Sequence, residues 1–97
     1  MVAELKPCFE RYLGQRLIDV MPYHSEWRMK TEEDCLPFCA VSSSRCRAIV
    51  YDVFQHICHY FTDDGTEHAI LFHGTVYFRV ASKLCLGKFL IFIEVSF

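Results

Sequence analysis

Apolar and polar residues alternate along the second half of the chain in the way that favours β-strands. The segment Arg47–Phe54 (RAIVYDVF) is rich in β-branched and aromatic residues, which is typical of a strand. After a turn at Gln55–His56, a second segment of this kind follows, so the pair is predicted to form a hairpin. This second hairpin strand is predicted at Ile57–Phe61. Two later strands are predicted at Ala69–Phe72 and Thr75–Ala81, with His73-Gly74 between them.

The first third of the chain carries a weaker pattern. Residues 8–20 mix apolar and charged side chains around Gly14, and they are predicted to form two short extended pieces joined by a turn. Residues 21–29 are predicted to be irregular, because Pro22 and Ser25 interrupt any regular period.

A helix is predicted from Thr31 to about Val41. Thr31 suits the N-cap position, and the acidic residues that follow it complement the helix dipole. Pro37 would cost about 3 kcal/mol inside an established helix. An effective start near Asp34 places this proline in the first turn, where it costs little. A helix combined with several strands indicates the α+β class.

Six cysteines indicate that this small domain is held together by disulfides. They are Cys8, Cys35, Cys39, Cys46, Cys58 and Cys85. An even number in a chain of 97 residues is typical of a disulfide framework outside the reducing cytosol. A single domain of this size has a limited core, so covalent bridges are useful. Cys35 and Cys39 share one helix face, from which both can bond to strands beneath it. The sequence alone leaves fifteen pairings open.

The net charge of −2 gives no general attraction for nucleic acid or acidic membranes.

The two ends of the chain raise a separate question. Residues 1–7 lack the basic and apolar regions of a signal peptide, so the chain is interpreted as a fragment, an excised domain or an incomplete gene product. The alternative is a cytosolic protein with free thiols. Residues 86–97 form an apolar tail too short to span a bilayer, expected to be an edge strand or a truncated continuation.

The block Asp34–Phe61 resembles the PAN/apple domain family. It has an acidic helix start, a Cys-x3-Cys pair, and then a strand of the type C-x-A-x-x-Y-D at Cys46–Asp52. A further cysteine lies in the next strand, and Cys8 and Cys85 match the outer pair of the family. The resemblance covers residues 8–85, and residues 1–7 precede it as a lead. By position it implies three nested bridges: Cys8–Cys85, Cys35–Cys58 and Cys39–Cys46.

The resemblance also implies a fold and a function. The family fold is a small antiparallel β-sheet wrapped around one short α-helix. Its members are mostly extracellular modules, secreted or within ectodomains, that bind proteins or carbohydrates. The chain is therefore expected to be a non-catalytic extracellular binding module that needs no cofactor. A structural module of an extracellular matrix or cuticle protein, assembled by self-association through its sheet edge, is the alternative.

Two chemical alternatives follow from the residue types. Zinc could be held by the four central cysteines together with His56 and His59, which would make an intracellular zinc-binding domain. Zinc sites usually show two close cysteine pairs, whereas only Cys35 and Cys39 are close here. A Ser or Cys nucleophile fits no motif, because Ser42–Ser44 lies in no G-x-S-x-G context and an even cysteine count leaves no free thiol. Neither a metal site nor catalysis is expected.

Basic residues near the fourth and sixth cysteines are the candidate ligand-binding residues: Arg45, Arg47, Arg79 and Lys83. If they converge, they can bind a sulfated sugar or an acidic protein surface through charge-assisted hydrogen bonds. Otherwise they are scattered, solvated surface charges. Tyr23 and Trp27 lie in the irregular segment before the helix. They are expected to cover the core, and as exposed side chains they would be contact residues.

Overall fold

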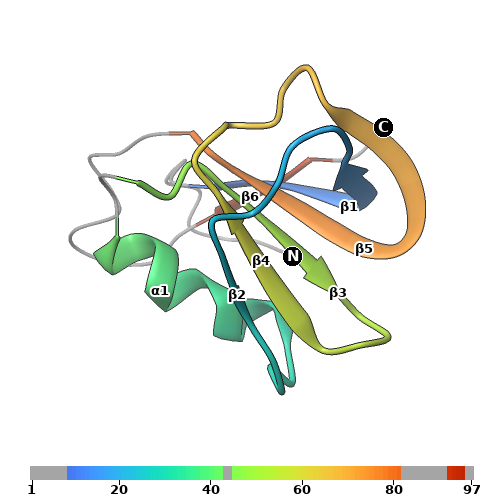
Figure 1. Cartoon of the computed structure of the whole chain (residues 1–97). Helices are drawn as coiled ribbons and strands as arrows, with labels where there is room; N and C mark the ends of the chain where they lie inside the picture. The colour runs from blue at the N-terminus through green and yellow to red at the C-terminus, as the bar shows by residue number, and fades with distance from the viewer. Residues whose placement is uncertain (1–8, 43–44, 82–91, 96–97) are drawn as a thin grey trace.

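The computed structural model of the chain describes residues 9–42, 45–81 and 92–95. Its described part contains a six-stranded sheet in the order β2-β4-β3-β5-β1-β6, with one helical segment across a face of the sheet (Figure 1). The strands are β1 (Phe9–Leu17), β2 (His24–Glu26), β3 (Ala48–Asp52), β4 (Ile57–Phe61), β5 (Ala69–Val80) and β6 (Phe92–Val95).

Strand pairing confirms the α+β class and adds one parallel contact. β1 pairs antiparallel with β5, β5 with β3, β3 with β4, and β4 with β2. β6 pairs with β1 in parallel, with Phe9 opposite Phe92 and Tyr12 opposite Val95. The described sheet is therefore antiparallel except at this one edge.

The predicted hairpin forms from β3 and β4, although β3 ends earlier than the sequence pattern suggests. The Asp52 side chain stops the strand, because its Oδ1 accepts the backbone N–H groups of Phe54 and Gln55 at 2.9 and 3.0 Å. Backbone groups bonded in this way are no longer available to a strand neighbour. The connection then ends at His56, whose φ of 59° is left-handed.

Two predicted breaks turn out to be distortions within continuous strands. β1 runs through Gly14, where φ is +73° and the register with β5 shifts between Leu13 and Gln15. β5 likewise runs through His73-Gly74, with φ of +97° at the glycine. The predicted turn at Gly14 and the predicted break before Thr75 are therefore wrong. A bulge bends a strand without ending its pairing. A glycine in the sequence does not show whether the chain forms such a bulge or a turn that ends the strand.

The segment predicted to be irregular contains the short edge strand β2. Its three residues pair with β4, where Ser25 lies opposite His59 and Glu26 lies opposite Cys58. A strand of three residues is too short to show alternation, and Pro22 lies just outside it. The prediction for residues 21–29 is corrected at these three positions.

The helical segment has two parts, the 3₁₀ turn η1 (Glu32–Cys35) and the helix α1 (Leu36–Val41). Its start follows the predicted chemistry, because the Thr31 N–H donates to Asp34 Oδ2 at 3.1 Å. Pro37 lies in the first turn of α1, where its missing N–H would have no helical partner in any case. The short helix from Thr31 to Val41 is therefore confirmed.

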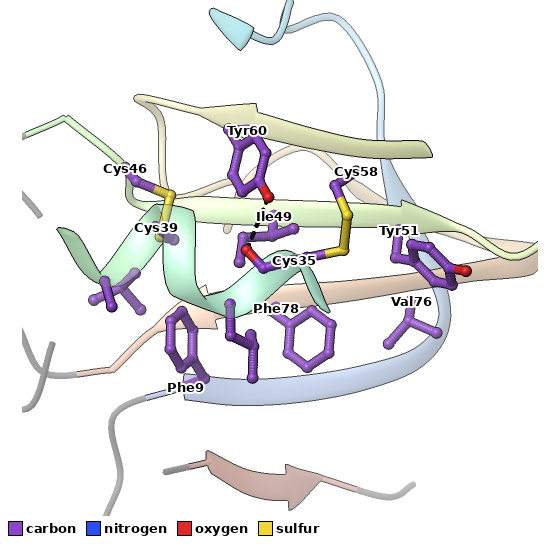
Figure 2. Packing of buried hydrophobic residues seen from close by; sticks show 13 residues of the cluster. Phe9, Cys35, Cys39, Cys46, Ile49, Tyr51, Cys58, Tyr60, Val76 and Phe78 are labelled. Atoms are coloured by element: carbon purple, nitrogen blue, oxygen red, sulfur yellow. Dashed lines mark hydrogen bonds between the residues drawn. A yellow bond between two sulfur atoms is a disulfide. The ribbon is translucent and has the colours of Figure 1, made fainter. Parts of the chain in front are cut away.

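The core lies mainly between the helix and the sheet. Buried apolar side chains from four strands meet the helix there, and they include Phe9, Ile49, Tyr60, Val76 and Phe78 (Figure 2). The Tyr60 hydroxyl donates to the backbone oxygen of Cys35 at 2.9 Å. A buried hydroxyl keeps its hydrogen bond in this way, and the same bond ties η1 to β4.

The opposite face of the sheet carries a second, smaller cluster of buried side chains: Leu17, Ala48, Val50, Phe61 and Tyr77. Tyr12 stacks on Tyr77 with ring centroids 5.2 Å apart, and the Tyr77 hydroxyl donates to the backbone oxygen of Asp64. β3 therefore has both faces buried, which explains its nearly unbroken apolar sequence.

Two disulfides attach the helical segment to the sheet. Cys35 is bonded to Cys58 in β4, and Cys39 is bonded to Cys46 just before β3. All four cysteines are fully buried. These are two of the three bridges that the family resemblance implies. The outer pair, Cys8 and Cys85, lies outside the described residues.

Loss of the two bridges is expected to have unequal effects on stability. The bridge Cys35–Cys58 joins residues 23 apart in sequence, and the bridge Cys39–Cys46 joins residues 7 apart. In the chain-entropy model these contribute roughly 3 and roughly 2 kcal/mol. Urea unfolding of the two double-alanine variants should therefore show a loss about 1 kcal/mol larger for Cys35→Ala/Cys58→Ala. A larger loss for the Cys39→Ala/Cys46→Ala variant would contradict this expectation.

Two glycines with similar backbone angles should respond differently to alanine. Gly14 and Gly65 have φ of +73° and +80°, a conformation that costs an L-residue about 1 kcal/mol. A Cβ at Gly65 would lie 2.6 Å from both methyl carbons of the buried Leu17, whereas a Cβ at Gly14 would meet nothing within 4 Å. Urea unfolding should show a loss of about 1 kcal/mol for Gly14→Ala and about 2–3 kcal/mol for Gly65→Ala. Equal losses would mean that Leu17 moves aside freely.

Candidate functional site

An open groove of about 620 Å³ lies between the segment after β2 and the turn that joins β3 to β4. Its lining residues are Trp27, Arg28, Lys30, Gln55 and His56, and we call it the Trp27 groove. Three of the five side chains carry nitrogen groups that are cationic or can become so. The groove therefore combines an exposed aromatic ring with basic groups.

The backbone beneath this groove is held at both ends by one residue. Glu26 lies opposite Cys58 in the β2–β4 pairing, and Cys35 is bonded to the same Cys58 through its sulfur. The segment of residues 27–34, which is the loop 27–31 and the start of η1, therefore has both of its ends fixed at Cys58. Closing a loop in this way reduces its conformational freedom, which favours a preformed binding surface.

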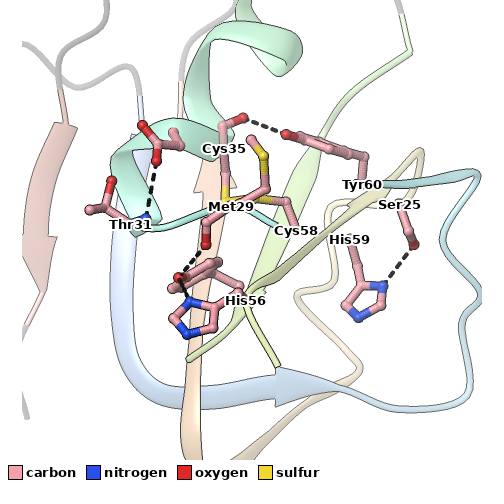
Figure 3. Close-up of a disulfide and its surroundings, with 10 residues drawn as sticks. Ser25, Met29, Thr31, Cys35, His56, Cys58, His59 and Tyr60 are labelled. Carbon is pink, nitrogen blue, oxygen red and sulfur yellow. Dashed lines mark hydrogen bonds between the residues drawn. A yellow bond between two sulfur atoms is a disulfide. The ribbon is translucent and has the colours of Figure 1, made fainter. Parts of the chain in front are cut away.

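Met29 holds the middle of the loop against the hairpin (Figure 3). Its N–H donates to the backbone oxygen of His56 at 2.9 Å, and its own carbonyl accepts the Tyr51 hydroxyl at 2.7 Å. The Met29 side chain packs against the core. Met29 is thus held against the sheet, whereas the Trp27 side chain is 63% exposed.

The cations of the groove have no competing partners among the described residues. Arg28 and Lys30 are exposed and take part in no ion pair within the part of the chain that the structure describes. Of the acidic side chains on either side, Glu26 lies 3.4 Å from His24, and Glu32 pairs with Arg11. The two cations are therefore available to an external anion.

His56 has a defined orientation because Tyr51 fixes one of its ring nitrogens. The Tyr51 hydroxyl, which already donates to Met29, lies 3.2 Å from His56 Nδ1. The hydroxyl has one proton, so it accepts from a protonated Nδ1. Burial and nearby acidic groups raise the pKa of Tyr51, which keeps this proton in place at physiological pH. The imidazole is thereby oriented beside the groove.

The predicted cationic residues do not form such an open surface. Arg79 makes a two-pronged ion pair with Glu10, with both N–O distances at 2.8 Å. Arg45 lies over the ring of Tyr23, 4.4 Å from its centroid. Arg47 is exposed, and Lys83 lies outside the described residues. Their joint role in ligand binding stays a prediction, with two of the four already engaged by neighbouring side chains.

The two aromatic residues of the predicted irregular segment have different positions. Tyr23 packs against the core, as expected, while Trp27 is exposed, so the expectation that it covers the core is wrong. Arg28, the residue after Trp27, has a left-handed φ of 65°. A sequence signal was present in the tetrapeptide Trp27–Lys30 (WRMK). It places two cations, Arg28 and Lys30, within three residues of an aromatic side chain, and the sequence prediction did not include either cation.

The described residues were compared with the requirements of a metal site and of a membrane-spanning helix. The four cysteines on which a zinc site would depend are paired as disulfides. The described residues also bring together no three His, Cys, Asp or Glu side chains in a way that could hold a metal ion. Within the same ranges, no helix has the length and apolar character that crossing a membrane requires.

The Glu10–Arg79 pair is expected to stabilise the fold rather than bind ligand. The hydrogen bond from Arg79 lowers the pKa of Glu10 below its ordinary value of 4.5. The pair therefore contributes stability above pH 4.5, and this contribution is lost as the pH falls through the lowered value. Arg79→Ala should cost about 1–3 kcal/mol at neutral pH, and less in acid. Urea unfolding across this range measures the difference, with exposed Arg47→Ala as the nearly neutral control. A loss that is independent of pH would contradict this role.

Comparison with known proteins agrees with this structure. The family model described as PAN domain matches residues 8–85, which include both disulfides, the helical segment and β1–β5. No curated protein gives a significant match to the chain. The match covers most of the 97 residues, and the chain therefore belongs to the PAN domain family.

Proposed function

We propose that the protein is a non-catalytic extracellular binding module whose ligand is an anionic carbohydrate, held in the Trp27 groove. PAN domains are modules that bind proteins or carbohydrates, which sets the class of function. The observation that carries the choice of ligand is the exposed Trp27 ring beside Arg28 and Lys30, two cations that pair with no carboxylate in the described ranges. An aromatic face accommodates a sugar ring, and cations bind its sulfate or carboxylate groups.

The local charge of the groove favours this ligand even though the whole chain is slightly acidic. The net charge of −2 does not attract polyanions in general, so any attraction has to come from a local cluster. The Trp27 groove provides such a cluster, because Arg28 and Lys30 are exposed and make no ion pair with any described residue. In the alternative cationic surface, Arg45 already contacts the Tyr23 ring and Arg79 is already paired with Glu10.

The small free energies of exposed ion pairs indicate that one module binds the glycan weakly and in a salt-dependent way. An exposed ion pair contributes about 0–1 kcal/mol, and salt screens such pairs at physiological ionic strength. Trp27 adds the contact area of a large, rigid ring. A polymeric glycan offers repeated anionic groups, and several modules on one chain would gain affinity by multivalency. The proposed role is therefore presentation of a rigid surface, without chemistry on the ligand.

An extracellular location is part of the proposal, and it rests on the disulfides. Two buried bridges are typical of an oxidising compartment, and the resemblance adds Cys8–Cys85 as a third. Mass spectrometry of the intact, non-reduced protein should show a mass lower by six hydrogens than that of the reduced chain. A mass lower by only four hydrogens would contradict the third bridge, and a fully reduced natively folded protein would contradict the extracellular location.

A second candidate function, self-association, is favoured by exposed apolar side chains in the β3–β4 turn and in β5. Phe54 and Leu71 are 69% and 81% exposed, and Phe72 and Val53 are also exposed. Exposed apolar patches often mark sites of protein–protein contact. Sedimentation of the protein over a range of concentrations, with Leu71→Ser as the variant, tests this function. A monomer at every concentration would exclude it.

Binding to a sulfated oligosaccharide is the direct test of the proposed function. The chain has one tryptophan, so the fluorescence of Trp27 reports on this groove alone. Titration with a heparin-derived oligosaccharide should change the emission, and the apparent affinity should fall as salt increases. Arg28→Ala/Lys30→Ala should lower the affinity about tenfold, because it removes two charge-assisted contacts.

The matched control is Arg45→Ala/Arg47→Ala, which removes two cations elsewhere. We expect this variant to bind with an affinity within about twofold of the unaltered protein, because exposed ion pairs outside the groove contribute little. Trp27→Phe, followed by calorimetry, tests the aromatic contact without the fluorescent reporter. If Arg45→Ala/Arg47→Ala loses binding and Arg28→Ala/Lys30→Ala keeps it, the binding surface is the one predicted from sequence, and the Trp27 groove is not the site.

A further inference from the structure

A second groove, of about 430 Å³, lies on the face of the sheet opposite the helix. The connection from β1 to β2 forms one wall, the bend in β5 forms the other, and β3 and β4 lie beneath it. We call it the His59 groove after the half-buried side chain among its lining residues. Gln55 lines both grooves, so the two lie on either side of the β3–β4 turn.

The apolar part of this groove comes from three directions. Val50 and Phe61 form the floor, and both are almost fully buried. Pro22 and Val20 line the wall next to β2, and Phe72 lines the wall next to β5. The lining is largely apolar with a few polar groups among it, and the volume falls within the range of about 300–1,000 Å³ typical of small-molecule sites.

His59 presents one unused nitrogen in this groove. Its Nδ1 lies 2.8 Å from the Ser25 hydroxyl on the neighbouring strand, which fixes the orientation of the ring (Figure 3). Burial lowers the pKa of His59, so the ring is neutral at physiological pH. Within the part of the chain that the structure describes, no partner is bonded to Nε2.

Two opposite charges line the same groove without pairing with each other. The Arg16 guanidinium lies over the Phe72 ring, 4.9 Å from its centroid, and it pairs with no carboxylate of the described residues. Asp52 uses Oδ1 for two backbone N–H groups, while Oδ2 has no described partner. Both charges act on His59, whose pKa Asp52 raises and Arg16 lowers. Because both side chains line the same groove of about 430 Å³, one small ligand in it can contact both charges.

We propose that the His59 groove binds a small zwitterion of the amino-acid class with an apolar side chain. The ligand carboxylate would pair with Arg16, its ammonium group with Asp52, and its apolar side chain would lie against Phe72 and Pro22. A ligand with only one charge would leave the opposite protein charge without a partner. A sulfated glycan is disfavoured here because Asp52 repels anions. This site is separate from the Trp27 groove, and it does not depend on the function proposed there.

Three related ligands test the charge requirement directly. Calorimetric titration would use L-phenylalanine, N-acetyl-L-phenylalanine, which lacks the ammonium group, and L-phenylalanine amide, which lacks the carboxylate. We expect the free amino acid to bind about tenfold or more tightly than either blocked form, because each blocked form loses one charged contact. Stronger binding of either blocked form would overturn the proposal, as would no binding of any of the three.

Two conservative variants test whether Asp52 binds the ligand's ammonium group and Arg16 its carboxylate. Asp52→Asn keeps an oxygen for the Phe54 and Gln55 N–H groups, so it should preserve the turn. In this variant the free and N-acetylated ligands should bind with equal affinity. In Arg16→Gln, the free amino acid and its amide should bind equally. Asp63→Asn is the matched control, because Asp63 also accepts a backbone N–H, from Gly65 at 2.7 Å, but lies outside the groove.

The outcomes separate this site from the Trp27 groove. Asp52→Asn and Arg16→Gln should still bind the heparin-derived oligosaccharide, and Arg28→Ala/Lys30→Ala should still bind L-phenylalanine. If Asp63→Asn alters the ligand preference as Asp52→Asn does, the effect is one of net charge and the proposed site is wrong. If both groove variants keep the full preference for the free amino acid, the proposal is overturned, whatever happens to oligosaccharide binding.

Discussion

The attachment of the helical segment to β4 at Cys58 is the constraint on which the rest of the structure depends. Cys58 is bonded to Cys35 through sulfur and lies opposite Glu26 in the sheet. Tyr60, two residues further along β4, donates a hydrogen bond to the backbone of Cys35. One short stretch of β4 therefore fixes both the helix and edge strand β2. The loop between them has little freedom left, although it contains no regular structure of its own. A small domain with a limited core achieves order in this way.

This constraint also explains how the binding surfaces arise. The covalent and hydrogen-bonded contacts lie on the helix side of the sheet, where burial is deepest. Side chains at the hairpin end are free to face solvent, as Trp27 does. Gln55 in the β3–β4 turn lines both grooves, so a single rigid hairpin supports two surfaces of different chemistry. One groove is aromatic and cationic, and the other is apolar with one charge of each sign. Function in such a domain resides in side chains placed on a fixed scaffold.

Much of this arrangement can be predicted from the sequence, because the decisive signals are local. Alternation identified β3 and β4, acidic residues after Thr31 identified the helix start, and the family resemblance implied the pairing of the four central cysteines. The errors have a common physical cause. Gly14 and Gly74 have turn-like residue chemistry, yet each distorts a strand whose pairing is maintained by its neighbours. Tertiary pairing of this kind is not visible in a local pattern.

The candidate sites were less predictable, because they depend on which charges are already paired. The sequence shows that Arg79 is basic, but not that Glu10, 69 residues away in the chain, takes up its charge. It shows Arg28 and Lys30 next to Trp27, but not that Met29 between them is held inward by two backbone hydrogen bonds. Availability of a charged group for a ligand is thus a property of the fold.

The most direct test of this account compares oligosaccharide binding by the two disulfide-deficient variants under conditions where circular dichroism shows both to be folded. Cys35→Ala/Cys58→Ala releases one end of the loop that carries Trp27, whereas Cys39→Ala/Cys46→Ala leaves both ends fixed. The account predicts weaker binding of the heparin-derived oligosaccharide by the first variant, and unchanged binding by the second. Equal affinities in the two folded variants would contradict the claim that Cys58 holds the binding loop in its active form.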